Sequence, residues 1–193
     1  MRRARTPARG RRHRLWRVRQ VIMLRGINLG PNRRVPMADL RALLTDAGYG
    51  EVQTYVQSGN VVVESTLKPA ELERETARLI SERFGFDVPV VVRTRRQLAA
   101  VVKLNPLGDV ATQPKLYQVT FLAEKPAASV IEALEDVAAG DERVVRHGRE
   151  IYTWHPDGVA RSKLANGLGA KKLGVATARN WATVNKLLEM TGG

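Results

Sequence analysis

The stretch VIMLRGINLGPNRR, residues 21–34, sets the fold of this chain. Its first four residues are apolar without polar alternation, a pattern typical of a strand that is buried on both faces. We therefore predict a strand over residues 21–25, followed directly by a loop rich in Gly and Asn. A helix over about residues 37–47 is expected next, because Pro36 suits a first helical turn and Gly48 suits a helix end.

The elements after this helix complete a ferredoxin-like arrangement. Residue patterns predict two strands joined by a turn, a second helix and a closing strand, over residues 51–56, 61–65, 70–84 and 88–93. The order β-α-β-β-α-β is that of a ferredoxin-like unit. Its first and third strands are central, and they are the apolar runs VIML and VVV. A lone unit covers one face of its sheet, so the second half of the chain is expected to pack on the other face.

The second half also alternates helices and strands. Its patterns predict a helix, a strand, a helix, two strands and two C-terminal helical pieces, over residues 95–104, 116–122, 127–139, 143–147, 150–155, 162–173 and 178–190. This order could mirror the first half, although the sequence shows no clear repeat. We predict one α+β body with a ferredoxin-like sub-domain over residues 20–93 and a second α/β sub-domain with C-terminal helices over residues 94–193.

Most of the positive charge lies in the first 19 residues. They hold nine of the 32 Lys and Arg residues and no acid, so the remaining 23 basic residues face 19 acidic ones. Such a tail could neutralise the phosphates of a nucleic acid or act as a targeting peptide. We favour a third interpretation, a disordered tail or a start codon assigned too early, because Arg outnumbers Lys and suggests GC-rich coding.

The composition excludes several classes of function. The absence of Cys removes disulfides, zinc-thiolate sites and cysteine nucleophiles, and it fits the reducing cytoplasm, where we expect the protein. The three His residues are not in a metal-ligand spacing, so we expect no metal and no cofactor. No apolar run approaches the roughly 18 residues of a membrane-spanning helix, so no membrane partner is expected.

The loop RGINLGPN has the features of an anion-binding site. Arg25 ends a strand, and the loop leads into a helix N-terminus, where backbone N–H groups favour negative charge. Arg25 adds a donor for phosphate or carboxylate, and Asn28 and Asn32 add amide groups. The loop matches neither the P-loop nor the G-x-G-x-x-G pattern. Its alternative interpretation is a tight connection in which Arg25 pairs with an acid.

The motif YVQSGN adds Gln57, Ser58 and Asn60 at the junction of two strands. Taken alone, these residues are typical of a structural hairpin turn. Ser58 is not in a G-x-S-x-G nucleophile elbow.

The segment RSKLANGLGAKKLGVATARNW carries the remaining polar candidates. Lys163 and Asn166 are three residues apart and share one helix face. If Thr177 caps the last helix, then Arg179 and Asn180 lie in its first turn, where a cation opposes the helix dipole and suggests a bound anion or a buried acid. For Lys171 and Lys172 we prefer a solvated face, and for Trp181 we prefer core packing.

These three motifs together identify a family. The strings LRGINLG, YVQSGN and RSKLxN…KKLG…TARNWxTVxKL resemble the bacterial family known as domain of unknown function 1697, over about residues 20–190. The resemblance implies an α+β fold with ferredoxin-like elements and no established activity. It also implies a set of signature polar positions: Arg25, Asn28, Asn32, Gln57, Ser58, Asn60, Lys163, Asn166, Arg179, Asn180 and Trp181. One departure is Gly30-Pro31 where members often have Gly-Gly, which removes an N–H donor.

The concentration of amide and cationic residues at strand ends favours a small anionic ligand between the two sub-domains. Ten of the signature positions, all except Trp181, are the expected ligand-binding residues. A nucleic-acid-binding module is the first alternative, and a non-catalytic interaction protein is the second. No reaction and no oligomeric state follow from the sequence; Lys163 is the only obvious candidate for a nucleophile or general base.

Overall fold

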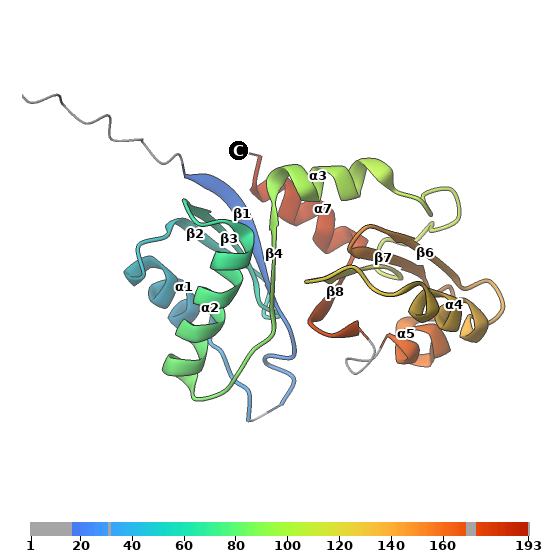
Figure 1. The fold of residues 1–193 in the computed structure, drawn as a ribbon, viewed down its shortest axis with the longest axis horizontal. Helices are drawn as coiled ribbons and strands as arrows, with labels where there is room; N and C mark the ends of the chain where they lie inside the picture. Colours follow the sequence, from blue (N-terminus) through green and yellow to red (C-terminus); the bar gives the residue numbers. More distant parts are fainter. Residues whose placement is uncertain (1–16, 31, 169–172, 193) are drawn as a thin grey trace, which may run out of the picture.

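The computed structural model describes residues 17–30, 32–168 and 173–192. It contains two antiparallel sheets of four strands each, which lie side by side with helices on their outer faces (Figure 1). The basic residues 1–16, Pro31, Lys171 and Lys172 lie outside the described residues.

The first half is the ferredoxin-like unit that the sequence predicts. Its elements are β1 (Val18–Leu24), α1 (Met37–Asp46), β2 (Gly50–Tyr55), β3 (Asn60–Ser65), α2 (Pro69–Phe84) and β4 (Val90–Thr94). The strand order β2-β3-β1-β4 places the two most apolar strands at the centre, as predicted. Strand β1 begins three residues earlier than expected, because Val18 still pairs with Ser65 and because Arg19 forms an ion pair with Glu64.

The second half repeats this topology. Its elements are α3 (Arg95–Leu104), β5 (Tyr117–Leu122), α4 (Ala128–Val137), β6 (Arg143–His147), β7 (Glu150–Trp154), the 3-10 turn η1 (Val159–Arg161), α5 (Lys163–Gly167), β8 (Ala176–Asn180) and α7 (Trp181–Met190). The strand order β6-β7-β5-β8 matches β2-β3-β1-β4 position by position. Each half is therefore a β-α-β-β-α-β unit followed by one further helix, α3 or α7. The fold confirms the mirrored order that the sequence left open.

One element of the second half differs from the prediction. The expected helix over residues 178–190 is preceded by a strand, β8, which pairs with β5 from Ala176 to Asn180. The helix begins only at Trp181, and its N-cap is Asn180, whose side chain accepts a hydrogen bond from the Thr183 N–H. The interpretation of Thr177 as N-cap, with Arg179 in the first helical turn, is therefore wrong. A five-residue strand with two alanines carries too little apolar pattern to be told from a helix start.

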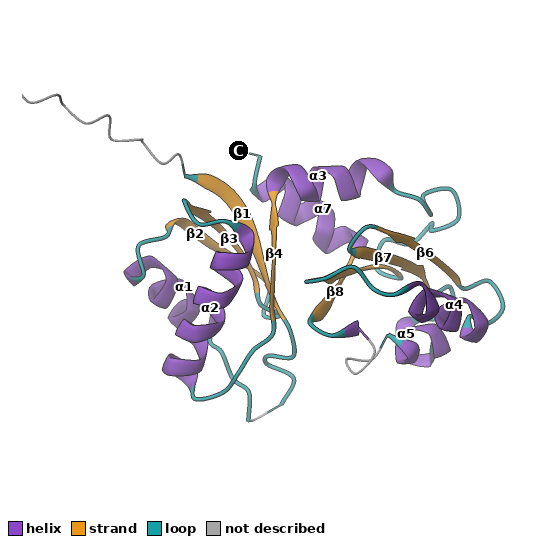
Figure 2. Ribbon diagram, viewed as in Figure 1, coloured by secondary structure: helices purple, strands orange, loops and turns teal. Residues whose placement is uncertain are grey.

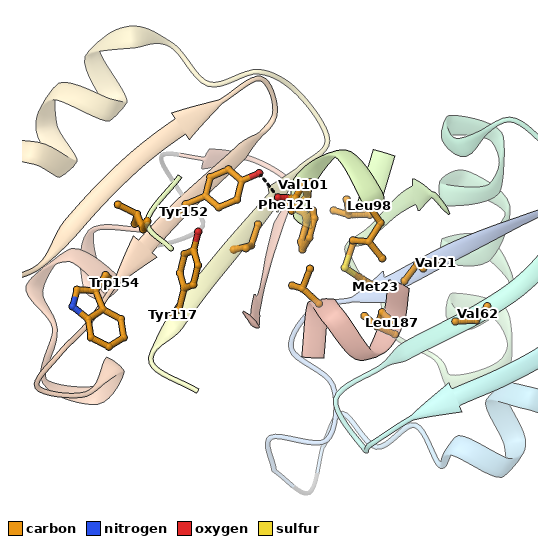
Figure 3. Close-up of a cluster of buried hydrophobic side chains, with 14 residues drawn as sticks. Val21, Met23, Val62, Leu98, Val101, Tyr117, Phe121, Tyr152, Trp154 and Leu187 are labelled. Atoms are coloured by element: carbon orange, nitrogen blue, oxygen red, sulfur yellow. Dashed lines mark hydrogen bonds between the residues drawn. The ribbon is translucent and has the colours of Figure 1, made fainter. Parts of the chain in front are cut away.

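The two halves share one core, which lies between the sheets. Apolar side chains from the inner faces of both sheets meet those of α3 and α7, and Figure 3 shows Leu98 and Val101 of α3 beside Met23 of β1 and Phe121 of β5. In Figure 2 these two helices run together along one edge of the interface. The prediction that the second half covers the free face of the first sheet is thus confirmed.

Two buried arginines connect the halves reciprocally. Arg93 on β4 lies opposite Val21 of β1, and Arg179 on β8 lies opposite Val119 of β5, so the two arginines occupy equivalent positions. Each reaches into the other half, where it binds the carbonyl at the end of the first strand. Arg93 donates to the Leu122 carbonyl at 2.6 Å, and Arg179 donates to the Leu24 carbonyl at 2.7 Å.

The equivalent partners of the two arginines differ in charge. Arg93 also donates to Glu150, the first residue of β7, at 2.8 Å. Arg179 donates to Asn60, the first residue of β3, which is the position equivalent to Glu150. One arginine therefore has a carboxylate as partner, and the other has an amide.

The Arg93–Glu150 pair should contribute strongly to stability. Replacing Glu150 by Gln leaves the Arg93 guanidinium, only 1% exposed, without a counter-charge. We expect Glu150→Gln to lower the free energy of unfolding in urea by on the order of 3 kcal/mol. The control is Glu189→Gln, which breaks the exposed Lys186–Glu189 pair and should change stability by less than about 0.5 kcal/mol. Equal effects of the two variants would contradict this account.

Gly59 is fixed by conformation and by space. Its φ is +77°, and an added Cβ would lie 2.7 Å from the Leu24 Cβ. We expect Gly59→Ala to lower the free energy of unfolding by more than about 1 kcal/mol, because Ala is strained at positive φ and must displace β1. Gly30→Ala is the matched control, since no described atom lies within 4 Å of its added Cβ and its φ lies outside the left-handed region. A small loss for Gly59→Ala would show that the turn can shift.

Candidate functional site

A cavity of about 200 Å³ lies where the end of β1 meets the second sheet. It opens on the outer face of that sheet, the face covered by α4 and α5. Its lining residues come from the β1–α1 connection, the three strands β5, β7 and β8, and the segment from η1 to α5: Arg25, Gln118, Thr120, Thr153, His155, Val159, Ala165, Leu168, Ala176, Thr177 and Ala178. The cavity therefore takes residues from both halves.

The outer face of the second sheet is more polar than the equivalent face of the first sheet. The strand registers make Thr120 equivalent to Ile22, and Thr153 equivalent to Val63. In the first half these positions are apolar and are packed under α1 and α2. The helix equivalent to α2 is also shorter, because α5 has five residues and α2 has sixteen. The second half thus places hydroxyl groups and a cavity where the first half has a continuous apolar core.

The hydroxyl of Thr120 has no hydrogen-bond partner among the described residues, although the side chain is buried. Burying a hydroxyl without a partner costs about 1–3 kcal/mol in proteins. Such a cost is expected where a polar atom of a ligand supplies the missing bond.

Next to Thr153 is a buried chain of polar side chains centred on His155. The imidazole Nε2 lies 2.8 Å from the Thr153 hydroxyl, and Nδ1 lies 2.8 Å from the Ser162 hydroxyl and 3.5 Å from the Glu142 carboxylate. Ser162 also caps α5 by accepting a hydrogen bond from the Ala165 N–H at 2.8 Å. The chain is therefore held in place by the start of a helix.

Burial and hydrogen bonding set the protonation states in this chain. Burial lowers the pKa of His155, and the nearby Glu142 opposes this effect only in part. Burial alone would raise the pKa of Glu142, but hydrogen bonds from Ser162, the Ala139 N–H and His155 together lower it. Near neutral pH the site therefore holds a neutral imidazole beside a carboxylate.

Two cations stand at the β1 end of the cavity. Arg25 is half-buried, and its guanidinium forms no hydrogen bond or ion pair with any residue that the structure describes. Arg179 lies directly behind the cavity wall, where it donates to the hydroxyl of the lining residue Thr177 at 2.7 Å. Burial lowers the pKa of Arg179 to about 10, so the guanidinium stays protonated at neutral pH. All of its described partners are neutral: Asn60, Thr177 and the carbonyls of Leu24, Ser58, Gly59 and Ala178.

Five of the predicted site residues, Arg179 among them, lie in two hydrogen-bonded groups. Asn28 donates to the Gln57 carbonyl at 2.8 Å, which joins the β1–α1 connection to the β2–β3 turn, and both residues line a separate hollow beside Gly30 and Arg34. Asn60 donates to the Ser58 hydroxyl at 3.0 Å and accepts from Arg179, and these three residues form a network behind the cavity.

The other predicted residues lie apart from this network. Arg25 lines the cavity, whereas Lys163 and Asn166 are exposed on α5 and are not lining residues. Asn32 is exposed in the β1–α1 connection, and Asn180 caps α7. Trp181 stacks on Tyr117 at a centroid distance of 4.7 Å, which confirms its core role. A ligand-binding role for the ten residues stays a prediction.

Sequence reasoning missed the polar floor of the cavity. Gln118 and Thr120 alternate with buried apolar residues in YQVTFL, and Thr153 and His155 do so in EIYTWH. Alternation is typical of a strand with one face in solvent, so these residues gave no signal of a cavity. Only the register of the repeat shows that Thr120 and Thr153 replace the apolar residues Ile22 and Val63.

Two further features bear on the site. Within residues 17–30, 32–168 and 173–192, no three His, Asp or Glu residues are grouped so that they could hold a metal ion. No helix in the same ranges is long and apolar enough to span a membrane.

Comparison with known proteins gives a similar structure and a protein family. The structure resembles that of the conserved bacterial protein SP0830 from Streptococcus pneumoniae, with a TM-score of 0.73 and 23% identity over 91% of this chain and 99% of that one. Among curated proteins, no relative matches the chain. The model of the family described as protein of unknown function (DUF1697) matches residues 18–152, and the chain therefore belongs to that family.

Proposed function

We propose that the protein binds a small anion, a carboxylate or an oxyanion, in the cavity between Arg25 and the second sheet. One observation carries the proposal: of two equivalent buried arginines, Arg93 has Glu150 as counter-charge, and Arg179 has only neutral partners among the described residues. A buried guanidinium without a counter-charge is costly, and an anion in the adjacent cavity would offset that cost.

The cavity supplies the contacts that such an anion needs. Arg25 offers a charged donor at the rim, and the Thr120 hydroxyl offers an unpaired polar group at the floor. Arg179 does not line the cavity, but its guanidinium lies directly behind the lining residue Thr177 and makes the electrostatic potential there more positive. A volume of about 200 Å³ is below the usual range of about 300–1,000 Å³ for ligand pockets, so the ligand is expected to be smaller than a nucleotide.

Anion binding can be tested by thermal unfolding. We expect sulfate, phosphate or a small dicarboxylate to stabilise the protein relative to chloride at the same ionic strength. A ligand at about 100 times its Kd should add roughly 2.7 kcal/mol. Arg25→Gln should weaken the affinity at least about tenfold, and the control Arg34→Gln, an exposed residue of the same connection, should not. No stabilisation by any anion, or equal losses in both variants, would reject the proposal.

A second variant tests the charge balance directly. Asn60→Asp gives Arg179 the kind of carboxylate partner that Arg93 already has. The internal charge should then replace the bound anion, so we expect the sulfate-induced rise in Tm to fall by more than half. The folded variant loses the hydrogen bond from Asn60 to the Tyr55 carbonyl, so its own Tm is not the readout. An undiminished sulfate response would show that Arg179 needs no external counter-charge.

A further inference from the structure

We propose that this cavity takes its anion together with one proton, and that His155 holds the proton. The inference rests on the anion-binding function proposed above and adds a positioning residue to the same site. It follows from the order of groups at the cavity wall: the Thr153 hydroxyl, then the His155 imidazole, then Ser162 and Glu142.

The first step concerns the hydrogen bonds of His155 in the protein without an anion. The Glu142 carboxylate and the Ser162 hydroxyl both lie beside Nδ1, which favours the tautomer that carries its proton on Nδ1. Nε2 then has a free lone pair, and it accepts the proton of the Thr153 hydroxyl over 2.8 Å. A hydroxyl donates only one hydrogen bond, so Thr153 has no donor left for the cavity.

The second step is what proton uptake changes. A proton from solvent binds Nε2, and the imidazolium now donates from Nε2 to the Thr153 oxygen. The hydroxyl hydrogen of Thr153 is thereby released and can point into the cavity, where it can donate to an anion. One proton added at His155 thus converts Thr153 from a group that offers only lone pairs to the cavity into a hydrogen-bond donor.

The third step is the charge around His155. The polar groups that contact it are Thr153 from β7, Glu142 before β6 and Ser162 at the N-cap of α5. Gln118, Thr120 and Arg25 line the same cavity, and Arg179 lies behind its wall. Glu142 is negative and stabilises an imidazolium, whereas Arg25 and Arg179 bring positive charge to the cavity. A bound anion offsets that positive charge, and the low pKa that burial gives His155 then rises.

Anion binding and proton binding at His155 are expected to strengthen each other. The pKa of His155 is low in the free protein and higher in the anion complex, so binding takes up protons between the two values. Anion affinity should therefore increase as pH falls, with a slope approaching about tenfold per pH unit in that window.

Sulfate is the probe for this test, because it does not titrate between about pH 5 and pH 8, where His does. Calorimetric titration of the full chain with sulfate, in two buffers of different ionisation enthalpy, gives the number of protons taken up. We expect a value that approaches one below neutral pH. The imidazole resonances provide a second readout, since the chain has three His residues. The resonance of His155 should titrate at higher pH with sulfate than without it.

Matched variants assign the proton. His155→Gln should bind sulfate without proton uptake, whereas His147→Gln, which alters an exposed residue of β6, should keep the uptake. Thr153→Val should lose most of the gain in affinity at low pH and, by linkage, most of the sulfate-induced shift in the His155 titration. The control Thr76→Val, which alters a buried threonine of α2 that does not line the cavity, should keep both.

The outcomes separate the two proposals. Sulfate binding without proton uptake, or with uptake that persists in His155→Gln, overturns the role of His155 and leaves the anion site intact. If His155→Gln does not fold, an unchanged His155 titration in the presence of sulfate overturns it equally. No sulfate binding at all rejects the anion site and this inference together.

Discussion

The reciprocal exchange of two buried arginines is the constraint on which this molecule depends. Each half ends its sheet with an arginine that donates to acceptors of the other half, at the end of the first strand and the start of the third. A guanidinium excluded from water must find nearly all of its partners in fixed positions. The turn at Gly59 and the contact between β4 and β8 help to meet that requirement.

The two halves differ in how the outer face of each sheet is built. In the first half the outer face of the sheet is apolar and is covered by two helices of ten and sixteen residues. In the second half the positions of Ile22 and Val63 hold the hydroxyl groups of Thr120 and Thr153, which lie with His155 beside a cavity, and the Thr120 hydroxyl is unpaired among the described residues. Polar burial of this kind weakens a core, so a well-packed first unit and a shared inner core can stabilise a second unit whose outer face is polar and hollowed.

The sequence predicted the first unit almost completely because three of its four strands, β1, β3 and β4, contain continuous apolar runs and its helices have clear ends. It missed β8, since ATARN has neither alternation nor an apolar run, and it therefore placed Arg179 at a helix start. The real reason for an arginine there is the partner across the interface, and no local pattern reports a contact over 119 residues. Nothing in the sequence indicated His155 and Thr153 as cavity residues, because they alternate with apolar residues, and such alternation is typical of a solvated face. Arg25, which lines the cavity, is a candidate from the sequence because it stands where a strand ends.

The arginine exchange also bears on how the chain could be rearranged. The start of β1 and the end of α7 are neighbours, since Val18 and Thr191 line one groove and Figure 1 shows the C-terminus beside β1. The link between the halves, from Asn105 to Leu116, contributes little to either sheet. A circular permutant opened in that link, with a short linker joining residues 17 and 192, would interchange the order of the units and preserve every strand pairing. The strand pairings thus do not require one unit to come first along the chain, and each arginine would still reach the strand end that it binds here.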